Sequence, residues 1–194
     1  MLPAEQHLSA IAEFLDDRRQ DLVRLRLVTA DDASFILSLR LDPIRNQNIS
    51  TISFDLDEQL AWMQAYARRC QAGQEAYFIV EEANEPQGTV RLYDYKQLHD
   101  SFCWGSWVLK PGRPSATAYK SAILVYDLGF KALGFSRAHF NVRQTNVSVW
   151  KFHEKMGARL EREDSLERIY RYELENYLPA RARLARFTQN RSFS

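Results

Sequence analysis

Two short stretches, KPGRPSATA at residues 110–118 and NVSVWKFHEKMG at residues 146–157, decide the fold class of this chain. Between them lie a long segment with helical periodicity and a short alternating strand. A turn whose backbone amides open a helix binds a diphosphate well, because the amides and the helix dipole both favour negative charge. A second helix just beyond it can place polar side chains beside whatever hangs from that diphosphate. The stretch therefore predicts a cofactor with a phosphate handle and a reactive arm.

The composition is that of one folded unit. Apolar residues make up 45% of the 194 residues and charged residues 26%, which disfavours disorder. We expect a main domain over residues 23–176, a helical extension over 1–22, and a basic helix and tail over 177–194. The formal net charge of +1 gives the chain no overall attraction for nucleic acid or an anionic membrane, so neither is expected as a partner.

Cysteine, histidine and apolar patterns narrow the class further. Cys70 and Cys103 lack the spacing of a zinc or redox motif, and the histidines are scattered, so no metal site is expected. No uncharged segment is long enough to cross a bilayer, and the N-terminus does not resemble a signal peptide. These features predict a cytoplasmic protein with reduced thiols. An exposed N-terminal helix and a basic C-terminal segment would suit a homodimer.

Strand and helix patterns alternate along the chain. Alternating or continuously apolar patterns predict strands at 23–27, 77–80, 89–93, 102–109, 137–142, 159–163 and 167–174. Helical spacing predicts helices at 4–20, 29–41, 55–73, from the turn after 109 to 133, at 146–155 and within 178–194. Gly105 lies inside the fourth strand, where a glycine indicates a bulge. Such a strand would splay from its neighbour and expose unpaired amides.

The order of these elements resembles that of the GNAT family of acyl-CoA-dependent N-acyltransferases over residues 23–176. The family's cofactor signature, Gln/Arg-x-x-Gly-x-Gly/Ala, is matched by RPSATA at 113–118, counted back from the helix ending FKALGF at 130–135. The resemblance implies an α+β fold, a mostly antiparallel, splayed mixed sheet flanked by helices, with acetyl-CoA as cosubstrate. Ala116 replaces the family's first glycine and Pro114 has no N–H to donate, and both changes bear on how closely a phosphate approaches.

The resemblance also assigns the contacts to the cofactor. An amide near Val108 or Leu109, on the bulged strand, would bind the oxyanion, and sequence leaves the choice between them open. The downstream motif contributes Asn146. The turn and the first helical residues would bind the diphosphate through Arg113, Ser115, Ala116, Thr117 and Ala118.

Acyl transfer to an amine requires a neutral nucleophile, stabilisation of a tetrahedral oxyanion and a proton for the departing thiolate. His153 stands where the family has a tyrosine that protonates the sulfur, so the resemblance implies that role for it. Asn146, Trp150 and His153 are spaced to share one helical face. The position of His153 near a helix C-terminus favours its protonated form. The alternative is a histidine that only complements the helix dipole.

A general base is less sharply indicated. Acidic or imidazole side chains end two strands and occupy the loop after the second, and any of them could take the proton of the amine, directly or through water. Asp94 is preferred, because it closes a strand on the side where the family places its acceptor. The other candidates are Glu81, Glu82, His99 and Asp100.

The N-terminal half resembles the GNAT branch that acetylates amino sugars on nucleotide carriers, and also the ribosomal-protein N-terminal acetyltransferases. The expected acceptor is therefore a small-molecule amine, with a nucleotide sugar as one candidate. Cationic and aromatic side chains suited to a nucleotide sugar are Arg40, Arg45, Trp62 and Arg91. A third hypothesis is a CoA-binding or interaction module that has the fold without the reaction, since Pro114, Ala116 and the missing tyrosine depart from the family pattern.

Overall fold

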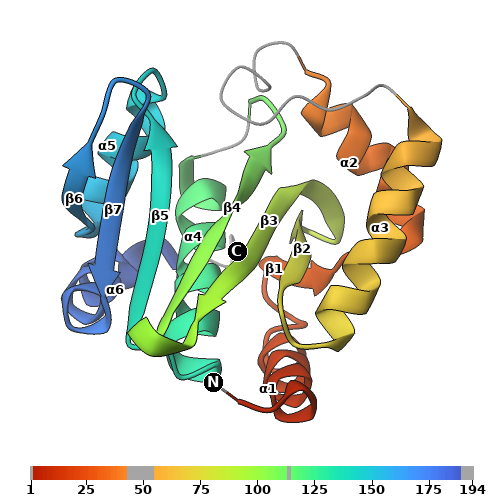
Figure 1. Ribbon diagram of the computed structural model, residues 1–194, viewed down its shortest axis with the longest axis horizontal. Helices are drawn as coiled ribbons and strands as arrows, with labels where there is room; N and C mark the ends of the chain where they lie inside the picture. The colour runs from red at the N-terminus through yellow and green to blue at the C-terminus, as the bar shows by residue number, and fades with distance from the viewer. Residues whose placement is uncertain (1, 43–54, 113–114, 189–194) are drawn as a thin grey trace, which may run out of the picture.

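Seven strands form one sheet in the computed structural model, which describes residues 2–42, 55–112 and 115–188 (Figure 1). The strand order is β1-β2-β3-β4-β5-β7-β6. The strands are β1 (Val23–Leu27), β2 (Ala76–Glu82), β3 (Glu85–Lys96), β4 (Ser101–Leu109), β5 (Arg137–Arg143), β6 (Arg159–Glu163) and β7 (Glu167–Glu173). The helices are α1 (Ala4–Asp16), η1 (Ala30–Asp32), α2 (Ala33–Arg40), α3 (Leu56–Gln71), η3 (Gln97–His99), α4 (Ser115–Asp127), η4 (Leu128–Ala132), α5 (Val147–Met156) and α6 (Leu174–Thr188).

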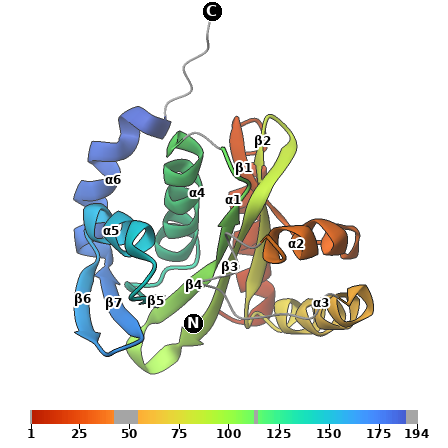
Figure 2. The same ribbon diagram turned by 90° about the horizontal axis from the view of Figure 1, so that it is seen from above.

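Helices cover both faces of the sheet (Figure 2). One face carries α4, α5 and α6 and is called the α4 face; the other carries α2 and α3 and is called the α2 face. Strand β2 is buried on both sides, because Ala76, Phe78 and Val80 belong to the core of the α4 face while Tyr77 and Ile79 belong to that of the α2 face. This explains why its sequence is apolar without a break rather than alternating.

The sheet is antiparallel except where β4 pairs with β5. These two strands run parallel and pair only through Ser101, Phe102 and Cys103, which lie opposite Arg137, Ala138 and His139. Beyond Cys103 no further pairing joins the two strands in the described part of the chain. The expected mostly antiparallel, splayed mixed sheet is therefore confirmed.

The bulge expected at Gly105 is also confirmed. Thr89 lies opposite Val108 and Arg91 opposite Gly105, so β4 uses two residues, Ser106 and Trp107, where β3 has one. Ser106 takes a left-handed conformation with φ of 48°, which is costly for a residue with a Cβ. A side chain at position 105 would meet the Tyr93 hydroxyl at 2.9 Å. The bulge turns β4 away from β5 and opens the split between them.

The long helix after this strand changes its hydrogen-bonding pattern near its end. It is an α-helix over Ser115–Asp127 and continues as one π-helical turn, Leu128–Ala132. Gly129 lies in this turn against the ring of Phe102, where an added Cβ would be 2.2 Å from a ring carbon. The π turn therefore lets the helix approach β4 at a position that admits no side chain.

Both ends of the described chain pack into the core. The sequence predicted an exposed N-terminal helix over 4–20, but α1 ends at Asp16 and buries Ile11 and Phe14 in the core of the α4 face. At the other end, α6 buries Tyr177 completely, and its hydroxyl donates to Asp127 Oδ1 on α4 at 2.8 Å. The two segments expected as appendages therefore cover apolar surface of the same domain.

Candidate active site

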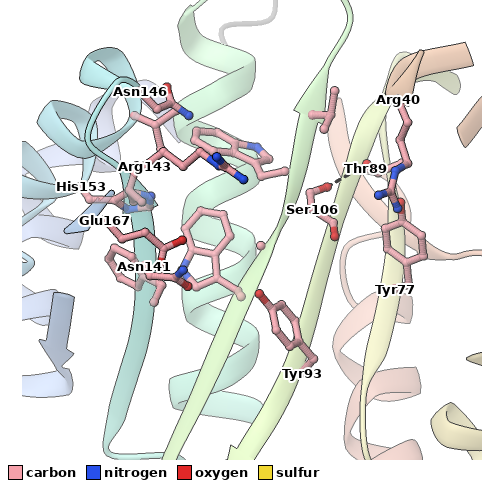
Figure 3. A pocket seen from close by; sticks show the side chains of 17 residues that line it. Arg40, Tyr77, Thr89, Tyr93, Ser106, Asn141, Arg143, Asn146, His153 and Glu167 are labelled. Carbon is pink, nitrogen blue, oxygen red and sulfur yellow. Dashed lines mark hydrogen bonds between the residues drawn. The ribbon is translucent and has the colours of Figure 1, made fainter. Parts of the chain in front are cut away.

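A cavity of about 380 Å³ occupies the split between β4 and β5 (Figure 3). The bulged half of β4, from Trp104 to Val108, and the second half of β5, from Phe140 to Arg143, both line it. Arg40 from α2 lines the cavity on one side of the sheet, and His153 from α5 lines it on the other. Because α2 and α5 cover opposite faces, the cavity passes through the sheet. A donor on one face and an acceptor on the other can meet inside it.

Two walls of the cavity carry different polar groups. Figure 3 shows Arg40, Tyr77 and Thr89 on one side, and Asn141, Arg143, Asn146, His153 and Glu167 on the other. On the first wall, the Thr89 hydroxyl donates to the carbonyl oxygen of Ser106 at 2.9 Å, which ties the bulge to β3. The walls are therefore polar and chemically distinct, as expected where two different substrates bind.

Backbone direction decides which amide of β4 faces the split. Lys110 donates its N–H to the Gln87 carbonyl on β3 at 2.7 Å. Since successive N–H groups of a strand point to opposite sides, Val108 also faces β3 and Leu109 faces away from it, toward the split. Of the two residues that the sequence left open, Val108 lines the cavity and Leu109 does not, but Leu109 is the one whose N–H points away from β3.

The first turn of α4 lies outside the lining of this cavity. Thr117 is fully buried, and its hydroxyl donates to Glu82 Oε2 at 3.0 Å, so this side chain anchors the helix to β2. Ala116 and Ala118 are partly exposed. The helix begins at Ser115. Arg113 and Arg45, two of the predicted binding residues, lie outside the described residues.

His153 is buried and neutral. Its side chain is 4% exposed, its ring centroid lies 4.2 Å from that of Phe140, and its Nδ1 lies 3.3 Å from the Tyr126 hydroxyl. Burial lowers the pKa of His153 to about 3. The expectation that the helix C-terminus would favour the protonated form is therefore wrong, because desolvation of a buried charge outweighs the helix dipole. The residue does line the cavity.

The expected shared face of α5 holds in part. Asn146 and His153 both line the cavity. Trp150 does not line it; its indole N–H donates to the Gln144 carbonyl at 3.3 Å, and the Arg168 guanidinium lies 4.2 Å from its ring centroid. The indole therefore packs against the neighbouring β5–β7 region instead of facing the split.

The predicted base, Asp94, is engaged elsewhere. Its Oδ2 lies 3.1 Å from His139 Nε2 and 3.3 Å from Lys96 Nζ, and Asp94 does not line the cavity. The other predicted candidates do not line it either: Glu81 pairs with Arg24 and Arg26, Glu82 accepts from Thr117, Asp100 accepts from the Ser136 N–H, and His99 ends η3. The structure therefore gives no support to a base at any of these positions.

The predicted substrate-binding residues separate into two groups. Arg40 lines the cavity. Arg91 instead forms an ion pair with the buried Glu75, and its guanidinium lies 5.4 Å from the ring centroid of Trp62 and 4.8 Å from that of Tyr93. Neither Arg91 nor Trp62 lines the cavity. Arg91 packs between Trp62 and Tyr93, and Trp62 packs against Tyr66 and Tyr77.

Several lining residues were missed from the sequence. Asn141, Arg143 and Glu167 line the cavity, as do Tyr93 and Ser106. The alternation in β5 carried a usable signal, because Phe140 and Val142 are buried in the core, which directs Asn141 and Arg143 to the opposite face. For Glu167 the strand alternation alone indicated a face but not a cavity.

Two negative findings concern the described residues only. No helix among them is long and apolar enough to span a membrane. They contain no cluster of three or more histidine, cysteine or acidic side chains that could bind a metal ion.

Known proteins with similar sequence or structure identify the family. The acetyltransferase (GNAT) domain family matches residues 23–159. Apo FdhC, described as a nucleotide-linked sugar GNAT, is 40% identical, with a TM-score of 0.80 over 87% of this chain and 96% of that one. No curated protein matches the sequence.

Two more distant structures show the same fold. RimJ from Mycobacterium smegmatis, in complex with CoA-disulfide, is 19% identical, with a TM-score of 0.72 over 84% of this chain and 88% of that one. A point mutant of the spermidine N-acetyltransferase SpeG from Vibrio cholerae is also 19% identical, with a TM-score of 0.68 over 81% of this chain and 96% of that one. The split between β4 and β5 and the cavity that passes through it are consistent with the family of the matched domain. This chain therefore belongs to the GNAT acetyltransferases.

Proposed function

We propose that this acetyltransferase transfers an acetyl group from acetyl-CoA to the amine of a nucleotide-linked amino sugar. The observation that carries the proposal is the 40% identity to a nucleotide-linked sugar GNAT over 87% of this chain. The likeness to RimJ and SpeG, at 19% identity, concerns the fold alone. A sugar amine is therefore favoured over a peptide or a polyamine.

The residues on the α4 side fit acetyl-CoA as the donor. A pantetheine arm carries amide groups, and the β4 edge at Leu109 offers it an N–H that β3 does not use. The partly exposed first turn of α4 at Ala116 and Ala118 offers helix N-terminal amides to the diphosphate. When bound, acetyl-CoA supplies the activated acyl group.

His153 acts in this proposal as a neutral hydrogen-bond donor. The Tyr126 hydroxyl is buried beside Nδ1. If that hydroxyl donates to Nδ1, the imidazole proton resides on Nε2. Such a tautomer offers an N–H donor at the cavity without the cost of burying a charge. The resemblance implied an imidazolium acid, and the buried neutral ring replaces it here.

On the α2 side, Arg40 is the cation placed to meet an anionic acceptor. Its guanidinium lies on the opposite wall from Arg143, and both line the cavity (Figure 3). A guanidinium binds phosphate oxygens with two parallel hydrogen bonds, which an ammonium cannot do. Arg40 would therefore bind the diphosphate of the acceptor, while the sugar amine extends into the split.

A substrate panel tests the proposal. Release of CoA is measured with UDP- and dTDP-linked amino sugars, the corresponding free amino sugars, short peptides and spermidine. We expect turnover with a nucleotide sugar and a kcat/KM lower by about tenfold or more with its free sugar, because the anionic contacts are lost. Arg40→Lys should raise the KM of the nucleotide sugar and leave that of acetyl-CoA unchanged.

Other outcomes would change the assignment. Acetylation of peptides alone would overturn the sugar proposal in favour of a protein N-terminal acetyltransferase. Calorimetry with acetyl-CoA separates a third case: tight binding without turnover of any amine would indicate a CoA-binding module.

A further inference from the structure

We infer that Glu167 is the carboxylate that binds the acceptor ammonium and accepts its proton. This inference rests on the amine acceptor of the proposed function and does not depend on the nucleotide. The GNAT reaction needs the amine in its neutral form, and none of the residues expected from the sequence to supply a base lines the cavity.

The carboxylates of the chain leave one candidate at the cavity. Among the residues that line it, Glu167 alone carries a carboxyl group. The segments that the structure does not describe, residue 1, 43–54, 113–114 and 189–194, contain no aspartate or glutamate in their sequence. His153, the imidazole at the cavity, has its pKa lowered to about 3 by burial and is a very weak base.

The position of Glu167 in the sheet places its side chain on the α2 face, the face on which the proposed acceptor binds. It begins β7 and lies opposite Arg143 of β5. Tyr170 and Tyr172 of the same strand are buried in the core of the α4 face, so Glu167, an odd number of residues away, projects from the opposite face. Asn141 and Arg143 project from that face too, and Figure 3 shows the three side chains together at one wall of the cavity.

The backbone of Glu167 is fixed independently of its side chain. Asp164 Oδ1 accepts the N–H groups of Leu166 and Glu167 at 2.8 and 2.9 Å, and the Asp164 N–H donates to the Glu167 carbonyl at 3.0 Å. These bonds form the turn between β6 and β7. The position of the carboxylate is thus set by a turn that a side-chain substitution leaves intact.

Its neighbours on the hairpin are neutralised, whereas Glu167 is not. Glu163 pairs with Arg168 at 3.1 Å, and Glu173 pairs with Arg137 and Arg171 at 2.9 and 2.8 Å. The Glu167 carboxylate makes no ion pair or hydrogen bond with the described residues. A carboxylate left without a partner at a cavity wall is available to a cationic ligand group.

The charged groups that face Glu167 are two guanidinium groups, so Glu167 is the one anionic side chain among the described residues at the cavity. Arg143 lies across the β5–β7 ladder and Arg40 on the far wall, while the cavity-lining His153 is neutral. The two guanidinium groups suit the anionic part of an acceptor. The single carboxylate suits its cationic part, so the cavity as a whole discriminates between the two ends of a zwitterionic substrate.

The proton and bond balance is simple. The acceptor ammonium gives one proton to the Glu167 carboxylate, and the nitrogen lone pair forms the N–C bond with the thioester carbonyl carbon. The C–S bond breaks, and the thiolate takes the second nitrogen proton, directly or through water. Glu167 returns its proton to solvent, so one proton is released for each amide formed.

A pH profile of Glu167→Gln tests the inference. The kcat/KM for the best acceptor of the panel is measured at pH values below and above the pKa of its amine. Glutamine cannot accept a proton, so the variant depends on the free amine in solution, whose fraction rises about tenfold per pH unit below the amine pKa. We expect the variant to be about 100-fold slower at the lowest pH. The deficit should shrink by about tenfold per pH unit as the pH rises.

Controls separate this role from a structural one. Glu161→Gln removes an exposed carboxylate of the same hairpin, 3.8 Å from Arg171, and should behave as the wild type. Glu167→Asp keeps a carboxylate and should keep the wild-type pH dependence at a lower rate. A deficit of Glu167→Gln that is the same at every pH, or full activity of that variant, would overturn the inference.

The test is independent of which amine the panel identifies. If peptides are the only acceptors, the nucleotide-sugar proposal fails and the same pH comparison is made with a peptide. If no amine is acetylated at all, the inference about Glu167 is refuted together with the enzymatic role of the cavity.

Discussion

The Oγ of Ser101 on β4 lies 2.9 Å from Nδ1 of His139 on β5. The other nitrogen of that ring lies 3.1 Å from Asp94 Oδ2 on β3. One imidazole therefore joins three strands of the sheet, and it does so at the short parallel pairing of β4 and β5, just before the strands separate. Ser101 is 2% exposed and does not line the cavity, so the contact holds the base of the split and takes no part in chemistry.

Loss of this contact should loosen the split. We expect Ser101→Ala and His139→Ala each to lower the free energy of unfolding by about 1–2 kcal/mol, because a buried polar partner loses its hydrogen bond. The KM for acetyl-CoA should rise several-fold as the spacing of β4 and β5 becomes less defined. Urea unfolding and steady-state kinetics check the two effects.

Ser38→Ala is the matched control for that pair. Its hydroxyl is exposed and donates to the Phe35 carbonyl on α2, away from the split. The Ser38→Ala substitution should leave the free energy of unfolding and the KM for acetyl-CoA unchanged. If Ser101→Ala alters stability but not the KM for acetyl-CoA, the contact does not set the width of the split.

The neutral state of His153 has a consequence for stability at acid pH. Its pKa falls from the ordinary 6.5 to about 3 on folding. Between these values the unfolded chain binds the extra proton, so stability is complete above pH 6.5 and falls as the pH is lowered. The loss is about 1.4 kcal/mol per pH unit for this group.

His153→Phe makes the effect measurable. At about pH 7.5 the variant should be less stable than the wild type by about 1–3 kcal/mol, because the Tyr126 hydroxyl loses its partner. At about pH 5 the difference should shrink by about 2 kcal/mol, because only the wild type is penalised by protonation at this site. His7 and His139, whose pKa values burial also lowers, are present in both proteins and cancel. An equal difference at both pH values would show that the buried imidazole is not the titrating group.

Much of the fold could be predicted because local signals agreed with the tertiary structure. The alternation in β5, the bulge at Gly105 and the helix that follows the 110–118 turn are each set by residues close in sequence. The limits of α4 were harder, since its π-helical end depends on Gly129 meeting Phe102 from a distant strand. A pattern of apolar residues does not distinguish an α turn from a π turn.

The site was predicted less completely, for a physical reason. The charge state of His153 depends on four aromatic neighbours from other elements, and no local pattern reports their desolvating effect. Asp94 was expected to end its strand, but β3 continues to Lys96, and the pairing of Asp94 with His139 is a tertiary contact. Glu167 lies at the cavity because β7 pairs with β5, and this pairing can be known only from the order of the strands in the sheet.

Arg91 should matter for stability rather than for substrate. Its guanidinium pairs with Glu75, which is 3% exposed, and stacks near Trp62 and Tyr93. We expect Arg91→Met to lower the free energy of unfolding by about 3 kcal/mol, because removing one partner leaves a buried carboxylate undercompensated. Arg69, 2.7 Å from Glu75, limits the loss.

The companion variant Glu75→Gln should recover part of that stability in the double mutant, since no buried carboxylate is then left undercompensated and Arg69 is partly exposed to solvent. Thermal unfolding of the four proteins measures the coupling. A selective rise in the acceptor KM of Arg91→Met, with stability unchanged, would instead return Arg91 to the substrate site.

The Leu109 amide can be tested by removing a single N–H. Leu109 lies opposite Gly88 and its N–H points away from β3, so Leu109→Pro deletes a donor that the ladder with β3 does not use. We expect the KM for acetyl-CoA to rise by about tenfold, the loss of one hydrogen bond at the donor site. Leu109→Pro should lower the free energy of unfolding by much less than Val108→Pro, which removes a donor directed at β3. Calorimetric titration with CoA checks the affinity, and Leu109→Ala, which keeps the N–H, serves as the control. If Leu109→Pro binds CoA as the wild type does, the open edge of β4 is not where the pantetheine arm pairs.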